Sequence, residues 1–272
     1  MKTRIITGVI IAAILIPMFV IGGYALNATL LFLTMAASYE LYMMFNKEKQ
    51  ISNLLLVSVI ILGGLTYYSI QNYYNGAPLE YVFLMVVGLL VVGALMLVFI
   101  DDFNGDDFGH LLISVLYPAI GFGALFGLRS INLYNLGFLF VITIFTDIFA
   151  YIVGVKFGKH RLAVKISPKK SIEGSIGGTV SAVIITIVYL EIFNVTNIGV
   201  IEMNIFASII LVIFISIMGQ IGDLVASKMK RGSGIKDFSN ILPGHGGIMD
   251  RFDSALFAAM VLMLVIKVVE VL

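Results

Sequence analysis

Long apolar runs alternate with short polar segments along the whole chain. Their apolar character is continuous and lacks the alternation of an outer-membrane barrel strand, so each run predicts a helix. A helix needs roughly 20 apolar residues to cross a hydrocarbon core of about 30 Å. Nine runs approach that length, at approximately residues 5–21, 26–45, 54–70, 81–100, 111–128, 136–155, 176–193, 205–221 and 255–271.

The composition agrees with this pattern. Of the 272 residues, 60% are hydrophobic and 12% are charged, and the mean hydropathy is +1.06. A soluble domain carries about 25% charged residues. The net charge of +1 indicates no nucleic-acid partner, and the absence of cysteine excludes disulfides and thiolate chemistry. The sequence therefore predicts an all-α polytopic membrane protein with about nine transmembrane helices.

Basic residues gather in every second connector. Of the 17 Lys and Arg residues, only Arg129 and Lys267 fall on the opposite side of the expected topology. Because cytoplasmic loops are enriched in Lys and Arg, we expect a cytoplasmic N-terminus and an external C-terminus in the cell's inner (cytoplasmic) membrane. The start Met1-Lys2-Thr3-Arg4 also fits a cleaved signal peptide. Eight further apolar runs favour an uncleaved first helix instead.

The chain changes character near residue 128. Residues 1–128 contain about five apolar runs joined by short loops, and we interpret the acidic segment 101–110 as a solvated loop, since it lacks the ligand pattern of an EF-hand. Residues 129–272 contain two long connectors, 156–175 and 224–253, which hold most of the charge. Connectors of this length are commonly functional. We therefore expect the catalytic region at 129–272.

The carboxylates of Glu40, Asp147 and Asp223 lie within or at the ends of apolar runs. A carboxylate at the centre of a membrane helix costs about 3 kcal/mol on insertion scales, so such residues are functional candidates. The alternative is a hydrated position at the membrane surface. For Glu40 the two interpretations are equal. For the two aspartates function is favoured, because basic, glycine-containing connectors follow them directly.

The first connector reads KFGKHRLAVKISPKKSIEGSIGG. Phosphate binding requires cations and closely approaching backbone N–H groups, which glycine permits. Ser167-Pro168 is predicted to start a helix with proline at its first position. A loop that touches anionic lipid head groups would need the lysines but no particular glycines. Both interpretations stay open on physical grounds.

The second connector contains an acidic pair beside the last apolar run. If the last helix begins near Met249, Asp250 and Asp253 are three residues apart and project from one face. Magnesium is typically held by one or two carboxylates and by substrate phosphates, so Asp223 could complete such a site. Cations that would neutralise phosphates surround it: Lys228, Lys230, Arg231, Lys236 and Arg251.

Two motifs resemble those of the phosphatidate cytidylyltransferases. One runs over 27 residues as Ser227-x-Met229-Lys230-Arg231-x4-Lys236-Asp237-x-Ser239, then Leu242-Pro243-x-His245-Gly246-Gly247-Ile248-x-Asp250-Arg251-Phe252-Asp253. The other is Asp147-x2-Ala150-Tyr151-x2-Gly154-x2-Phe157-Gly158-Lys159, then Ser167-Pro168-Lys169-Lys170-Ser171-x-Glu173-Gly174. This similarity covers the chain from about residue 147. The family commonly has Thr-Trp where this chain has Ser171-Ile172, which puts any stacking role of that tryptophan in doubt.

The resemblance implies a reaction in which CTP and phosphatidate give CDP-diacylglycerol and pyrophosphate for phospholipid biosynthesis, with Mg²⁺ required. It also suggests a homodimer. We assign Asp223 and Asp250 to the metal and Asp253 as a nearby ligand or orienting group. So many carboxylates are compatible with a second, monovalent cation.

The remaining motif residues are assigned to catalysis or to the substrates. Asp147 and Glu173 either bind metal or position the lysines, and His245 serves either in structural hydrogen bonding or as an acid. The catalytic group is Asp223, Asp250, Lys236, Asp237 and His245. The substrate-binding group is Lys169, Lys170, Ser171, Glu173, Ser227, Lys230, Arg231, Gly246, Gly247 and Arg251.

Two other classes of protein compete with this interpretation. An ion- or proton-coupled transporter could use Asp147 and Asp223 within the membrane, but it leaves the basic, glycine-rich connectors unexplained. Another lipid-modifying transferase would share the metal and phosphate chemistry. The chain lacks the closely spaced aspartate series of an alcohol phosphotransferase.

Overall fold

The computed structural model describes residues 2–47, 49 and 52–272, with side chains from residue 6 onward. The side chains of Lys2 and Arg4, which support the expected orientation, lie outside the described residues. The described chain forms nine helices and two small antiparallel sheets, and it divides into two compact units. Unit 1 comprises residues 1–130 and 233–251, and unit 2 comprises residues 131–232 and 252–272.

Each predicted apolar run corresponds to one helix. The helices are α1 (Lys2–Ile21), α2 (Gly23–Phe45), α3 (Asn53–Tyr74), α4 (Glu80–Phe99), α5 (Gly105–Ile131), α6 (Leu133–Phe157), α7 (Ile172–Ile192), α8 (Ile205–Gly232) and α9 (Met249–Val271). Eight of the described helices, α2 to α9, are long and apolar enough to cross a membrane, and the apolar part of α1 is shorter, at Ile6–Ile21. The prediction of a helical, multi-pass membrane protein is confirmed.

Several helices extend beyond their apolar runs, because polar residues can continue a helix into water. α5 begins inside the acidic segment, and α8 continues to Gly232, so the first part of the connector 224–253 is helical. α9 begins at Met249, as predicted. Side-chain caps mark other starts: Ser52 accepts a hydrogen bond from the Leu55 backbone N–H ahead of α3.

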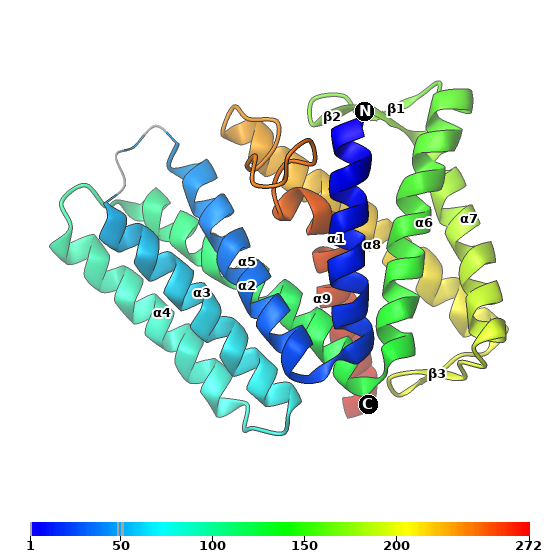
Figure 1. Ribbon diagram of the computed structural model, residues 1–272, viewed down its shortest axis with the longest axis horizontal. Coiled ribbons are helices and arrows are strands. Elements are labelled where there is room, and N and C mark those ends of the chain that lie inside the picture. The colour runs from blue at the N-terminus through cyan, green and yellow to red at the C-terminus, as the bar shows by residue number, and fades with distance from the viewer. Residues whose placement is uncertain (1, 48, 50–51) are drawn as a thin grey trace. The chain divides into compact units, whose positions relative to one another are not determined.

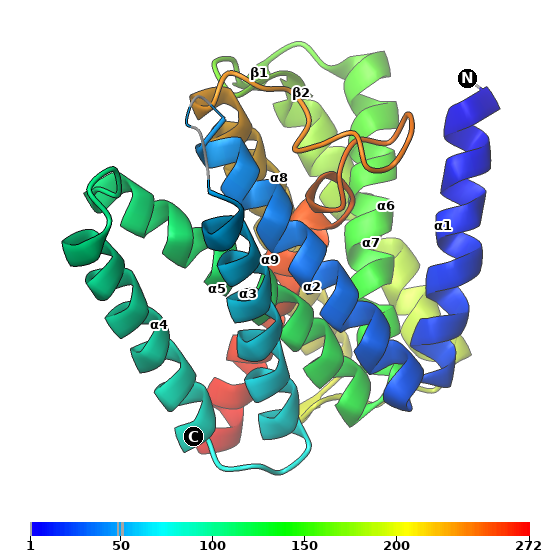
Figure 2. The ribbon, with the colours of Figure 1, turned by 60° about the vertical axis from the view of Figure 1, so that its left-hand side comes forward.

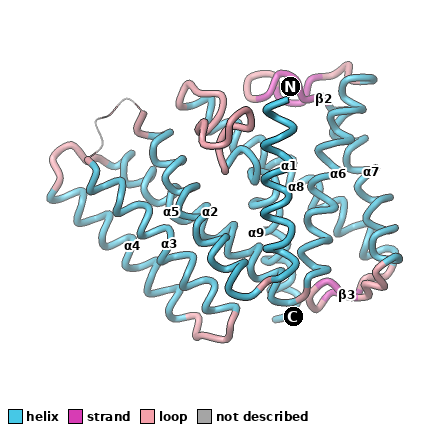
Figure 3. Tube along the Cα trace, viewed as in Figure 1, coloured by secondary structure: helices cyan, strands magenta, loops and turns pink. Residues whose placement is uncertain are grey.

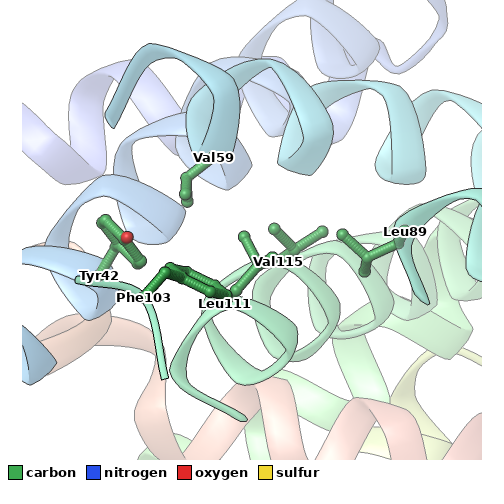
Figure 4. Packing of buried hydrophobic residues seen from close by; sticks show 6 residues of the cluster. All are labelled: Tyr42, Val59, Leu89, Phe103, Leu111 and Val115. Atoms are coloured by element: carbon green, nitrogen blue, oxygen red, sulfur yellow. The ribbon is translucent and has the colours of Figure 1, made fainter. Parts of the chain in front are cut away.

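Unit 1 contains α1 to α5, and α2, α3 and α4 run side by side (Figures 1 and 2). Buried side chains from α2 to α5 and from the α4–α5 connection meet in one cluster (Figure 4). In a bilayer this close packing supplies much of the attraction between helices, since lipid is as apolar as the side chains. The cluster consists of Tyr42, Val59, Leu89, Phe103, Leu111 and Val115.

The acidic segment 101–110 is not the solvated loop expected from the sequence. Asp107 is buried, and its carboxylate binds Lys49 Nζ at 2.6 Å and accepts a hydrogen bond from the Asn104 backbone N–H at 2.9 Å. Asn104 Oδ1 in turn accepts from the backbone N–H of Asp106 and Asp107. The segment therefore starts α5 and ties it to the α2–α3 connection.

Unit 2 contains α6 to α8, most of α9 and both hairpins. The strands β1 (Arg161–Ala163) and β2 (Ser167–Ser171) join α6 to α7 at one end of these helices, and β3 (Asn197–Ile198) and β4 (Ile201–Glu202) join α7 to α8 at the other (Figure 3). α6 and α7 approach closely through glycine. A Cβ atom on Gly178 would lie 2.5 Å from the carbonyl oxygen of Thr146. Glycine is therefore required where the two backbones meet.

Candidate functional site

A cavity of about 640 Å³ lies in unit 2 between α6, the β1–β2 hairpin, the start of α7 and α8. Its polar lining combines acids with bases. Asp147 comes from α6 and Asp223 from α8, while Arg161, Lys169 and Lys170 come from the hairpin. Such a cavity, with cations facing carboxylates, suits an anionic ligand that arrives with a metal ion.

Lys170 and Asp223 form an ion pair across this cavity. Both side chains are about one quarter exposed, so water screens the pair only in part. Ser227, one turn further along α8, has its hydroxyl 3.2 Å from Asp223 Oδ1 and donates a hydrogen bond to it. Ser227, predicted to bind substrate, thus orients the carboxylate that was predicted to bind metal.

Asp147, Asp223 and Asp253 are close enough to repel one another electrostatically. The hydroxyl of Ser254 donates a hydrogen bond to Asp147 at 3.1 Å, and the charge of the buried Lys230 acts on Asp253. Among the described residues, no three His, Asp or Glu side chains converge tightly enough to hold a metal alone. The group fits Mg²⁺, which takes one or two protein carboxylates and completes its shell with water and phosphate oxygens.

The connector 156–175 folds differently from its prediction. Ser167-Pro168 does not start a helix, because residues 167–171 pair with β1 as a strand. The helix start is Ser171 instead, whose Oγ accepts a hydrogen bond from the Gly174 backbone N–H at 3.1 Å. A serine hydroxyl at the N-cap satisfies one of the unpaired N–H groups of the first turn, and a proline two residues earlier does not compete with it.

Glu173 secures the base of the same hairpin. Its carboxylate lies 2.6 Å from His160 Nδ1 and accepts hydrogen bonds from the backbone N–H groups of Lys159 and His160. These contacts favour the positioning role that the sequence had left open for Glu173. Lys169 and Lys170 follow on β2 and line the cavity. The glycines that the sequence offers for phosphate contact, Gly174, Gly177 and Gly178, pack against α6.

A chain of hydrogen bonds that sequence reasoning missed runs from the cavity into the helices. Gln220 lines the cavity, and its Nε2 donates to Thr179 Oγ1 at 3.0 Å. Ser216 Oγ lies 2.9 Å from Thr179 Oγ1 and 2.8 Å from Thr146 Oγ1. Small polar side chains are common within apolar runs and do not indicate a function by themselves. The sequence alone does not show that these residues, which lie on three separate helices, contact one another.

The motif segment of unit 1 is a compact turn closed by Asp250. Asp250 Oδ2 accepts hydrogen bonds from the backbone N–H groups of Phe238 at 2.8 Å and Gly247 at 2.9 Å. Leu242 and Gly246 form an isolated antiparallel bridge. A Cβ atom on Gly246 would meet both Asp250 and Asp237. The structure therefore brings together Asp237, Gly246, Gly247 and Asp250, which the motif places up to 13 residues apart.

His245 lies in this turn and packs toward α1. Its Nε2 would be 3.3 Å from a Cβ atom on Gly8, and within the described chain its buried Nδ1 has no hydrogen-bond partner. The structural and the acid role both remain predictions. Three other predicted cations are exposed: Arg231 at the end of α8, Lys236 in the segment 233–248, and Arg251 in the first turn of α9.

Glu40, which the sequence left between a functional and a hydrated position, is fully buried in α2. It accepts hydrogen bonds from the hydroxyl of Ser239 at 2.6 Å and from the backbone N–H groups of Ile248 and Met249 at 2.9 Å each. The hydrated alternative is therefore wrong. In the sequence, Glu40 stands out only as a single acidic residue in an apolar run. Its hydrogen-bond partners become visible only in the fold.

The sequence is similar to proteins of known family. The sequence profile of the cytidylyltransferase family matches residues 2–269. The chain is similar to the phosphatidate cytidylyltransferase of Staphylococcus haemolyticus, with 37% identity over 94% of this chain and 95% of that protein. It is also similar to the enzymes of that name from Staphylococcus saprophyticus, at 36% identity over 94% and 95%, and Bacillus subtilis, at 30% over 94% and 94%.

Proposed function

The chain belongs to the cytidylyltransferase family and is a nucleotidyltransferase, and from that premise we propose that it transfers CMP from CTP to phosphatidate. The products are CDP-diacylglycerol and pyrophosphate. The observation that carries the proposal is the cavity of unit 2, where Asp223 faces Lys170 beside Asp147 and Lys169. The comparisons do not favour an ion-coupled transporter built on Asp147 and Asp223.

The proposed reaction needs no strong general base. A phosphate monoester has a second pKa of roughly 6 and is already an anionic nucleophile near neutral pH. One of its oxygens attacks the α-phosphorus of CTP, and the bond to the bridging oxygen of pyrophosphate breaks. The protein must hold two polyanions in line and offset the charge on the departing pyrophosphate. Lysines, arginines and a metal ion are suited to that task.

In unit 2, Lys169 and Lys170 would bind phosphate oxygens of either substrate. Lys170 can leave Asp223 for a phosphate, because both partners stay partly exposed to the cavity. Ser171 joins the hairpin directly to α7 by accepting a hydrogen bond from the Gly174 N–H. Glu173 accepts a hydrogen bond from the His160 N–H, just before β1. Mg²⁺, when bound, would neutralise phosphate charge beside Asp223. Asp147 and Asp253 place further carboxylate oxygens near Asp223, which could share in holding such a cation.

The motif carries the remaining assignments. Asp250 is proposed as a metal ligand, and Asp237 and Lys236 as catalytic partners. His245, Gly246 and Gly247 would line the nucleotide site. The cations proposed to hold the triphosphate of CTP are Lys230, Arg231, Lys236 and Arg251.

The location of the polar groups follows from the substrates. The phosphate of the lipid lies at the head-group plane, and CTP is dissolved in the cytosol. The reactive groups therefore belong at the cytoplasmic ends of the helices, which matches the distribution of Lys and Arg. A homodimer stays a prediction from the family resemblance.

The direct test supplies purified protein in detergent with radiolabelled CTP, phosphatidate and Mg²⁺. We expect a labelled lipid and an equal amount of pyrophosphate, no product after chelation, and recovery when Mg²⁺ is restored. CTP consumption without a labelled lipid would overturn the proposed acceptor. Ion or proton flux across vesicles without CTP turnover would favour the transporter hypothesis instead.

Asp250→Asn tests the metal assignment. The amide keeps one oxygen that can accept from Phe238 or Gly247, so the turn is expected to stay folded while the charge is lost. Pyrophosphate release should fall by at least about 100-fold, since removing a stabilising charge from a transition state commonly costs 10²–10³ in rate. Near-normal release from a folded variant would refute the assignment.

A further inference from the structure

Glu40 takes no part in the chemistry proposed above. This residue lies in the half of the chain that carries no family motif, five residues before the end of α2. Its side chain is fully buried, and both carboxylate oxygens are used. Oε1 accepts from Ser239 Oγ and the Ile248 N–H, and Oε2 accepts from the Met249 N–H.

These partners form the entrance to α9. The first N–H groups of a helix have no partner within the helix, and its N-terminus carries partial positive charge. A carboxylate is stabilised in that position. Glu40 can therefore be buried, because one hydroxyl and two backbone N–H groups donate hydrogen bonds to its carboxylate. Glu40 thus caps α9 from a different helix.

Gly247 makes this approach feasible. A Cβ atom at that position would lie 2.6 Å from each oxygen of Glu40, so any larger residue would force the carboxylate away. On the other side, the Gly247 N–H donates to Asp250. The glycine therefore lies between a capping carboxylate and a proposed metal ligand.

The same segment has a second anchor on α1. The hydroxyl of Thr7 donates a hydrogen bond to the carbonyl oxygen of Pro243 at 3.0 Å. The segment 239–249 is thus fixed at its middle by Thr7 of α1 and at its two ends by Glu40. Its shape depends on helices that the motifs do not include.

We propose that Glu40 is a positioning residue: it holds the segment 239–249, and through it sets the orientation of Gly246, Gly247 and Asp250 for nucleotide transfer. Glu40 itself touches neither substrate nor metal. The inference rests on the proposed function for its kinetic consequence, while the capping itself is independent of the reaction.

Glu40→Gln is the central variant. An amide of the same shape has one acceptor oxygen, so at least one of the Ile248 and Met249 N–H groups would face an NH₂ group instead of an acceptor. We expect kcat/KM for CTP to fall about 10- to 100-fold, the usual effect of removing a partner that orients a ligand. Hydrogen exchange in a peptide covering residues 247–252 should become faster. Glu40→Asp, which keeps two acceptor oxygens, should restore part of both properties.

Two further variants separate positioning from general stability. Ser239→Ala removes one of the three hydrogen bonds and is expected to fold, with a smaller loss of kcat/KM in the same direction. Asp107→Asn is the matched control, because Asp107 is also a buried carboxylate of unit 1 near a helix start. It should lower the unfolding temperature without changing the KM for CTP or exchange in residues 247–252.

The outcomes are distinct. Wild-type kinetics in both Glu40→Gln and Ser239→Ala would overturn the inference, as would unchanged exchange in residues 247–252. If the wild-type protein makes no labelled lipid at all, the proposed function fails, and the exchange measurement alone then decides whether Glu40 caps α9.

Discussion

At the scale of single residues, the arrangement around Asp223 is a balance of charges. Lys170 offsets one carboxylate of an acidic group that also includes Asp147 and Asp253. Ser227 fixes the direction of the Asp223 carboxylate. Because the pair lines a cavity, we propose that Lys170 exchanges its carboxylate partner for a phosphate of the substrate.

Lys170→Ala removes both the counter-ion and the proposed phosphate contact. The KM for CTP or phosphatidate should rise, and kcat/KM should fall about 10- to 100-fold, in line with losing one charge-assisted contact of about 1.5–3 kcal/mol. The Mg²⁺ dependence should become steeper, because a cation from solution must then neutralise Asp223. Steady-state kinetics with varied Mg²⁺ measures both effects.

Lys165→Ala is the control for this charge change. Lys165 is exposed in the turn between β1 and β2 and does not line the cavity. Its loss should leave both KM values unchanged. If Lys170→Ala behaves like Lys165→Ala, the hairpin serves only as a basic surface for lipid head groups.

At the scale of elements, the β1–β2 hairpin owes its position to the packing of α6 against α7. Close backbone approach at Gly178 lets the two helices leave the bilayer side by side. Ser171 is both the last residue of β2 and the N-cap of α7, so no loop residue separates the strand from the helix. The lysines on β2 are held by this short linkage.

Gly178→Ala should therefore destabilise the protein. The added methyl group would lie 2.5 Å from the Thr146 carbonyl oxygen and 2.9 Å from Ala150 Cβ, so the helices must separate. Overpacking of this kind costs about 1–3 kcal/mol. Thermal unfolding in detergent should show a lower midpoint. In Gly88→Ala, where the added methyl group meets nothing within 4 Å, the midpoint should stay unchanged or rise.

The sequence predicts the helices well because a run of about 20 apolar residues has few alternatives. It also predicts the start of α9 at Met249. It does not predict the hairpin, since Ser167-Pro168 reads equally as a helix start. It misses the polar extension of α8 to Gly232, because nothing apolar marks it.

The site is harder to predict than the fold. Local motifs indicate the acidic residues and the residues proposed to bind phosphate, and several of these residues share one cavity. The partners that orient them leave no local pattern. Glu40 meets Ile248 across 208 residues of sequence, and the link from Gln220 to Thr146 crosses three helices. Such contacts depend on the packing of the bundle.

At the scale of the whole molecule, the basic connectors predict which side faces the cytoplasm. The native chain contains no cysteine, so single cysteines can report this orientation without a background signal. Lys165→Cys lies in the β1–β2 turn, and Asn75→Cys lies after α3. Both side chains are exposed.

In intact cells, a membrane-impermeant maleimide should label Asn75→Cys, and it should label Lys165→Cys only after the membrane is opened. The reason is that Lys and Arg remain on the cytoplasmic side during insertion. Leu272→Cys should label like Asn75→Cys. Labelling of Lys165→Cys in intact cells would reverse the proposed topology and place the cavity away from cytosolic CTP.

The cap on α9 has a consequence for biogenesis. During synthesis, α2 enters the bilayer with Glu40 long before the ribosome has made its partners, which follow 199 to 209 residues later. An unpaired carboxylate disfavours a membrane helix by up to about 3 kcal/mol, the value at the helix centre, so Glu40 should weaken the insertion of the nascent α2. Arrival of the ninth helix would relieve that penalty, and the segment 239–249 would take its final shape as the last step of assembly.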